Sequence, residues 1–270
     1  MTTADAATAL LATSQGSFFY IPTLNDFFPP AILFEGTIFQ FDRIQLVRLV
    51  VVAVTLTFLC LVASRATIVP GRVQSIVEAI VEFVDKNIIV GTLGLRDGAK
   101  YGPMLMTMFF LIFVMNLAGL VPGLNIPGSS VIGLPLLLAL WTFATYVFFG
   151  IKHHGLGGYL RHATAPPGVP KVVYLLLIPI EVIQVFIVRW ASLTIRLLAN
   201  MIGGHMIIVV LLGITNALVL SMSWLVVISP AAIALSLGVF AFKLFVAGLQ
   251  AFIFTILSAV YIQMAISDEH

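Results

Sequence analysis

An arginine at position 196 is the residue with the clearest chemistry in an otherwise apolar stretch. It lies in WASLTIRLLANMIGGHM, residues 190 to 206, which contains no acidic residue. A guanidinium keeps its proton at physiological pH, and an unpaired charge at bilayer depth costs from a few to more than about ten kcal/mol. Arg196 therefore needs a partner from elsewhere, and it is a candidate functional residue.

Other polar residues share a helical face with this arginine. At about 100° per residue, one narrow stripe carries Arg189, Ser192, Arg196, Asn200 and Gly203, and apolar side chains fill most of the remaining surface. One interpretation is that a protein partner satisfies the two arginines for structural reasons alone. Two arginines, an asparagine and a glycine in line favour a path for ions instead.

The composition places these residues in a membrane. Of the 270 residues, 61% are hydrophobic and only 9% are charged, and the mean hydropathy of +1.15 lies far outside the range of soluble domains. The apolar length suffices for five or six crossings of about 20 residues each. We therefore predict that residues 1–270 form a single membrane domain. The net charge of +2 and the scattered basic residues argue against binding to nucleic acid.

Metal and cofactor sites are not expected. The only cysteine, Cys60, lies in an apolar run and allows no internal disulfide. The other candidate ligands are His153, His154 and His162, which lie in residues 151 to 171. No carboxylate accompanies them, so we interpret this stretch as a solvated or headgroup-facing loop.

The predicted fold is all-α and polytopic, with five crossings and one amphipathic helix. Residues 1–43 are expected to form an outer N-terminal and interfacial segment, because they are aromatic and broken by prolines. The crossings are predicted at 44–64, 103–121 and 131–150, a surface-lying amphipathic helix at 72–90, and two long helices at 171–220 and 230–266.

The two predicted long helices are longer than an upright crossing of the membrane requires. A helix of 37 residues, from 230 to 266, spans about 55 Å at 1.5 Å per residue, against a hydrocarbon core of about 30 Å. We therefore predict that both are steeply tilted and antiparallel. Pro179 and Gly203-Gly204 are candidate bends in the first of them, and Ser229 before Pro230 predicts the start of the second.

Basic residues predict the orientation. Residues 65 to 102 carry five lysines and arginines, residues 121 to 130 carry none, and residues 152 to 171 carry three. By the positive-inside rule, the N-terminus lies outside and the C-terminus lies in the cytoplasm. The segment that bears Arg196 then runs from inside to outside.

The polar residues of the two long helices are predicted to form two layers. Lys243 and Gln250 are seven residues apart and share a helical face. If Arg196 is level with Gln250, then His205 is level with a residue close to Lys243. The His205 layer would lie on the outer side of Arg196, and Glu181 would lie on the cytoplasmic side.

With these residues in view, the chain resembles subunit a of the F-type ATP synthase. The resemblance covers most of the chain from Pro29 onward and rests on VPGRVQSIVEAI, FVMNLAGLVPGLNIPG, SLTIRLLANMIGGH and LQAFIFTILSAVYIQMA. An arginine four residues before an asparagine, followed downstream by the glutamine of QAFIF, is the specific part. PPGVP and ANMIGGH look most similar to actinobacterial members.

The resemblance implies a stator subunit in a bacterial cell membrane, with no catalytic site of its own, that couples proton flow to ATP synthesis. The implied partners are a rotor ring of small carboxylate-bearing subunits, the peripheral stalk subunit b and membrane lipid. By position in the motifs, Arg196 would face the ring carboxylates and separate two aqueous half-channels, with Asn200 and Gln250 as polar neighbours. His205 and Lys243 occupy places where many relatives carry a carboxylate and histidine pair.

Several alternatives stay open at this point. A secondary transporter would show two repeated halves, which this sequence lacks, and a purely structural anchor would use its embedded charges only to pair with partner subunits. His205, which titrates near neutrality, is predicted to relay protons in the outer half-channel and Lys243 to tune it. The alternative is that Lys243 extends to the outer surface. Whether the transported ion is sodium or the proton would depend on the ion-binding site of the ring.

Overall fold

The computed structural model describes residues 31–33, 41–121, 132–164, 171–220 and 227–267, without the side chains of residues 31–33, 41–43, 161–172, 217 and 220. Its elements are β1 (Ala31–Leu33), β2 (Phe41–Asp42), α2 (Arg43–Ser64), α3 (Arg72–Val84), η3 (Asp85–Val90), α4 (Gly91–Ala118), α5 (Gly133–Thr164), α6 (Lys171–Ile183), η4 (Gln184–Val188), α7 (Arg189–Leu220) and α8 (Ser229–Ile266), where η marks a π-helical turn. The short antiparallel β1–β2 pair lies in the segment predicted as an interfacial loop. All other elements of the described chain are helices, which confirms the all-α prediction.

Five helical stretches are long and apolar enough to cross a membrane, as predicted. They cover Ile44–Ser64, Arg72–Ala118, Gly133–Leu160, Val173–Asn216 and Ser229–Ile266. A helix satisfies its backbone hydrogen bonds internally, which is what a lipid environment demands of a crossing segment. The long helices are confirmed, since α8 alone has 38 residues.

The helix that contains the second predicted crossing is longer than that crossing. Helix α4 starts at Gly91 instead of Pro103 and ends at Ala118, and Pro103 lies inside it. The break lies at Gly94, whose φ of 75° and ψ of 175° are non-helical. A glycine takes a positive φ without a steric penalty, so the chain turns at Gly94 and the helix then continues through the proline.

The loop predicted after the third crossing is wrong for residues 151 to 164. Helix α5 continues to Thr164 across a break at Gly155, where φ is 72° and ψ is 166°. After the break the helix returns onto the preceding turns, because Tyr159 is 3% exposed and a Cβ at Gly150 would overlap its ring. Packing of this tyrosine into the notch at Gly150 orders a stretch that its glycines and histidines alone do not predict to be helical.

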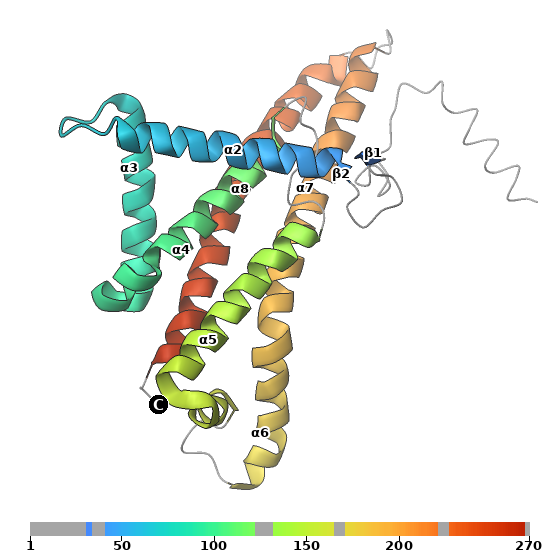
Figure 1. The fold of residues 1–270 in the computed structure, drawn as a ribbon. Coiled ribbons are helices and arrows are strands. Elements are labelled where there is room, and N and C mark those ends of the chain that lie inside the picture. The colour runs from blue at the N-terminus through green and yellow to red at the C-terminus, as the bar shows by residue number, and fades with distance from the viewer. Residues whose placement is uncertain (1–30, 34–40, 122–131, 165–170, 221–226, 268–270) are drawn as a thin grey trace, which may run out of the picture.

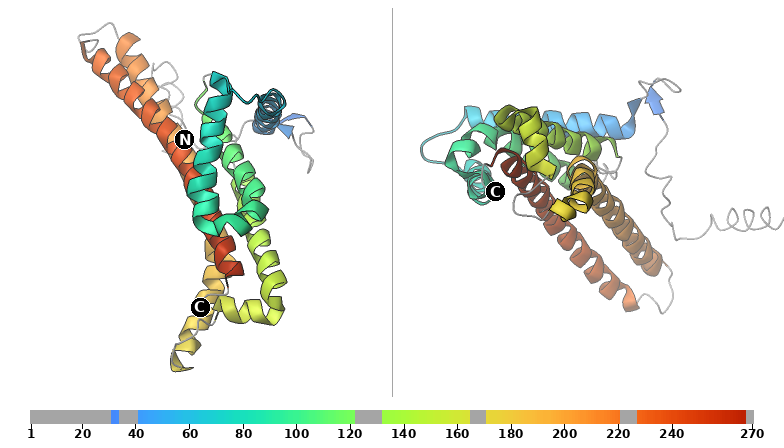
Figure 2. Two further views of the ribbon diagram at one scale, coloured as in Figure 1. Left: turned by 90° about the vertical axis from the view of Figure 1, so that its left-hand side faces the viewer. Right: turned by 90° about the horizontal axis from the view of Figure 1, so that it is seen from below.

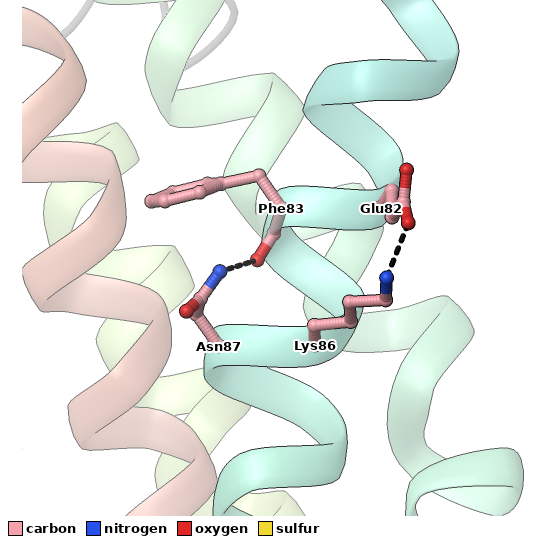
Figure 3. A network of polar contacts seen from close by, with 4 residues as sticks. All are labelled: Glu82, Phe83, Lys86 and Asn87. Atoms are coloured by element: carbon pink, nitrogen blue, oxygen red, sulfur yellow. Dashed lines mark hydrogen bonds and ion pairs between the residues drawn. The ribbon is translucent and has the colours of Figure 1, made fainter.

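Helix α3 and the turn η3 form the predicted amphipathic helix at 72–90. Its exposed side carries an ion pair between Lys86 and Glu82, and Asn87 Nδ2 donates a hydrogen bond to the Phe83 carbonyl oxygen at 2.7 Å (Figure 3). On the side that faces α8, the rings of Phe83 and Phe252 lie 5.8 Å apart. The contact with α8 is therefore apolar. The ion pair joins two residues of the same helix and, being exposed, contributes little to stability.

Helices α4, α5, α7 and α8 share one hydrophobic core, which includes Leu105, Tyr146, Leu197 and Phe254. Helices α7 and α8 run antiparallel and side by side, as predicted, while α2 lies across the bundle (Figures 1 and 2). The start of α4, the break in α5 and the end of α8 lie at one end of the bundle, and the end of α7 and the start of α8 lie at the other (Figure 1).

Candidate functional site

Arg196 lies on the open side of α7. The opposite side of this helix is buried through Leu193, Thr194 and Leu197, which are 2%, 3% and 0% exposed. Arg196 itself is exposed, next to Ile195, which is 64% exposed. Within the described part of the chain, Arg196 has no hydrogen-bond, ion-pair or ring partner. The fold thus holds the helix firmly on one side and presents an unpaired cation, among apolar side chains, on the other.

The structure fixes the register between α7 and α8 at Gly204. A Cβ at this glycine would overlap the Lys243 ammonium and its Cε atom. Lys243 therefore crosses from α8 to the backbone of α7, next to His205, and does not extend along α8 towards the helix end. Continued along the antiparallel pair, this register places Arg196 level with Ala251, beside Gln250. The predicted proximity of His205 and Lys243 is present.

Gln250 is buried, with 6% of its surface exposed, although it was predicted as a polar neighbour of an ion path. Its Nε2 atom has no hydrogen-bond acceptor in the described structure. Asn116 of α4 lies close to the same turn of α8, because its Nδ2 donates to the Ala247 carbonyl oxygen at 3.5 Å. Asn200 is partly exposed, one turn after Arg196. A buried amide donor without an acceptor is costly.

A cavity of about 390 Å³ lies on the other side of Arg196, away from His205. We call it the Arg189 cavity. Its polar lining residues are Gln184, Arg189, Ser192 and Tyr261, and its apolar ones are Ile180, Ile183, Val188 and Met264. Glu181, predicted for this side, lies on α6 and is not among the residues that line the cavity.

The segment before α7 is irregular at a place the sequence did not indicate. The predicted bends at Pro179 and Gly203-Gly204 lie inside α6 and α7, whereas the π-helical turn η4 spans Gln184–Val188. Two side chains bind its carbonyl groups. Tyr146 Oη of α5 donates to the Val185 oxygen at 2.6 Å, and Trp190 Nε1 donates to the Phe186 oxygen at 2.6 Å.

The Arg189 guanidinium rests against two tyrosine rings. Its Cζ atom lies 5.9 Å from the ring centre of Tyr146 on α5 and 5.1 Å from that of Tyr261 on α8. Both distances are in the range of cation–π attraction. Sequence analysis placed Arg189 on the polar stripe and did not select it as a site residue. No pattern in the sequence connects three residues on three different helices.

A second pocket between α7 and α8 lies beyond His205. It has a volume of about 390 Å³ and is lined by Met206, Ile207, Val210, Leu211, Leu235 and Val239. Its apolar lining contrasts with the Arg189 cavity. The described residues contain no group of three or more His, Cys, Asp or Glu side chains placed to hold a metal ion.

These features define a class: a helical, multi-pass membrane protein in which the long helix α7, packed against α8, carries an arginine without a partner among the described residues, with polar residues on either side of it. Residues 45–263 match the protein family described as ATP synthase A chain. The chain is 35% identical to an ATP synthase subunit a of Rhodococcus erythropolis over 265 residues, which cover 97% of this chain and 96% of the relative. It is also 35% identical to an ATP synthase subunit a of Pseudarthrobacter chlorophenolicus, over 98% of this chain and 99% of the relative. A third relative, from Frankia alni, is 36% identical over 76% of this chain and 71% of its own length.

The chain therefore belongs to the ATP synthase A chain family. A member of this family is a membrane-sector subunit of an ATP synthase, in the part of the complex that translocates protons.

Proposed function

We propose that this chain is a non-catalytic stator subunit that carries protons past a rotor ring. The observation that carries this proposal is Arg196, a permanent cation among apolar neighbours with no partner in the described residues. Leaving such a charge unpaired at membrane depth is costly, so an anion from another subunit has to face it. Small ring subunits with one carboxylate each supply that anion, one after another, as the ring turns.

The cation acts as a switch between two half-channels. A ring carboxyl group arriving neutral from lipid ionises where water or a fixed cation stabilises its anion, and Arg196 supplies the cation without losing its own proton. The same charge repels protons that would cross directly. Each proton must then travel around the ring, and about 2.3 kcal/mol per 100 mV becomes available for rotation.

The two half-channels lie on opposite sides of Arg196. His205 and Lys243 belong to the outer one, where His205 relays protons and Lys243 tunes it. The Arg189 cavity belongs to the cytoplasmic one, and Glu181, which lies on α6 outside the cavity lining, is assigned to the same side. Asn200 and Gln250 are the polar neighbours of Arg196, and water or the ring supplies the acceptor that the Gln250 amide lacks.

The chain is placed in the bacterial cell membrane with its N-terminus outside and its C-terminus in the cytoplasm, as the basic residues predict. Helix α2 has 22 residues, about 33 Å at 1.5 Å each, which matches an upright crossing of a core of about 30 Å. Because α7 and α8 run across α2 (Figure 1), an upright α2 implies that they are steeply tilted. The peripheral stalk subunit b and lipid cover other faces.

Reconstitution of the whole complex tests the proposal. We expect Arg196→Ala to abolish proton-driven ATP synthesis while the complex still assembles, because the substitution removes the fixed charge and leaves the packing intact. The matched control is Ile195→Ala, which truncates an exposed neighbour and should keep most of the activity. Normal coupled synthesis in Arg196→Ala would contradict the mechanism, and failure to assemble would favour the structural anchor. Substrate transport by the isolated chain would favour a secondary transporter.

A further inference from the structure

The proposed mechanism gives no role to one partly buried side chain in the wall of the Arg189 cavity, that of Arg189 itself. Arg189 is a permanent cation seven residues before Arg196 and therefore on the same side of α7. Unlike Arg196, it has partners within the chain, the rings of Tyr146 and Tyr261. It lines the Arg189 cavity together with Gln184 and Ser192. An arginine used only for packing does not need other polar side chains beside it in the wall of a cavity.

The π-helical turn η4 supports this position of Arg189. A turn of this kind is rare and is found frequently at functional sites. It ends at Val188, directly before Arg189, so it determines which way the first turn of α7 faces relative to α6. The hydroxyl of Tyr146 binds its Val185 carbonyl group while the ring of the same tyrosine lies under the guanidinium. One tyrosine thus fixes both the turn and the arginine.

We propose that Arg189 is a second fixed charge of the proton path, and that Tyr146 and the turn η4 position it. This inference rests on the proposed function and assigns a role to the cytoplasmic half-channel. An acidic ring group that reaches this side must give up its proton before it meets Arg196. A guanidinium in the cavity wall favours the ionised form of such a group and so promotes release of the proton to the cytoplasmic side.

Other titratable groups near Arg189 cannot supply this charge. Tyr146 and Tyr159 face it from α5, and Tyr261 faces it from α8. Phenols are neutral near pH 7. Glu181 of α6 does not line the cavity and has the opposite charge. Among the residues that line the Arg189 cavity, the guanidinium is the one permanent charge.

The test measures initial rates of ATP synthesis by the reconstituted complex while the pH on the side of the catalytic sector is varied. The outer pH and the membrane potential stay constant. Without the guanidinium, an acidic group releases its proton only at higher pH, so Arg189→Gln should move this profile upward by about one pH unit. Arg189→Lys keeps a cation and should move it by less. Tyr146→Phe, which removes the hydroxyl but keeps the ring, should move it in the same direction by a smaller amount.

Lys100→Gln is the matched control, because Lys100 also lies over two aromatic rings, those of Tyr101 and Phe149, and does not line the cavity. Its profile should coincide with that of the parent. An unchanged profile in Arg189→Gln, with Arg196→Ala inactive, overturns this inference and leaves the proposed function standing. Should Arg189→Gln not assemble, an unchanged profile in Tyr146→Phe overturns it instead. Coupled synthesis in Arg196→Ala would contradict the proposed function itself.

Discussion

The two polar regions on either side of Arg196 are built in different ways. On one side, Arg189 is held by two tyrosine rings and a π-helical turn, beside a cavity whose lining also includes the polar residues Gln184 and Ser192. On the other, Lys243 lies in the notch at Gly204 next to His205, and the neighbouring pocket is apolar. The first region carries a permanent charge, and the second carries groups that can gain and lose a proton. This difference suits release of protons on one side and uptake on the other.

The position of Lys243 depends on the glycine at position 204. A lysine can reach across from α8 only because α7 has no side chain at position 204. No ion pair neutralises Lys243 within the described residues. The His205–Lys243 pair therefore consists of two groups of the same charge type, which repel one another when both are protonated.

The largest effect is expected at Arg196, which separates the two regions. Arg196→Lys keeps a positive charge, but the ammonium is a point donor that can surrender its proton when desolvated. We expect proton-driven synthesis to be almost entirely lost in the reconstituted complex, while assembly, measured by the yield of purified complex, stays at the parental level. Activity close to that of the parent would show that any cation suffices there.

Gly204→Ala should have the next largest effect. The added methyl group overlaps the Lys243 ammonium, and overpacking of this kind costs about 1 to 3 kcal/mol unless the lysine moves away. We expect synthesis to slow several-fold, as measured by initial rates. The matched control is Gly203→Ala, since a Cβ at Gly203 meets nothing within 4 Å. Equal rates in the two variants would contradict the seating of Lys243 on α7.

Lys243→Gln tests the tuning of the outer region. A nearby ammonium disfavours a second positive charge on His205. Its removal should therefore move the dependence of synthesis on the outer pH upward, by about one unit. His205→Ala should slow synthesis without uncoupling it. If the profile stays the same in Lys243→Gln and His205→Ala works at full rate, both residues are structural and water alone carries the protons.

The smallest functional effect is expected from cysteines placed to test the orientation. The starting variant is Cys60→Ser, because Cys60 is the only cysteine and is exposed. A cysteine at Ser129 should react with an impermeant reagent added outside, and one at Gly157, where a Cβ meets nothing within 4 Å, should not. Neither should alter synthesis. The reverse labelling pattern would exchange the roles assigned to the Arg189 cavity and the His205–Lys243 pair.

The sequence predicted the number and type of the crossing helices because hydrophobicity acts along the chain. A run of some twenty apolar residues has to become a helix in lipid, whatever surrounds it. The polar stripe of α7 was equally predictable, since residues three, four and seven apart share a helical side. The facing of His205 and Lys243 followed from counting along two antiparallel helices. The helix breaks did not, because glycines such as Gly94 and Gly155 allow several backbone conformations locally.

Of the candidate site, the sequence alone determined which ionisable groups lie within the apolar segments. Only the tertiary structure decided how they are held. The π-helical turn depends on a hydroxyl from α5, the position of Arg189 on rings from two other helices, and that of Lys243 on a missing side chain in α7. Each of these joins residues that are distant in sequence, and their contact depends on how whole helices pack, which no local pattern encodes.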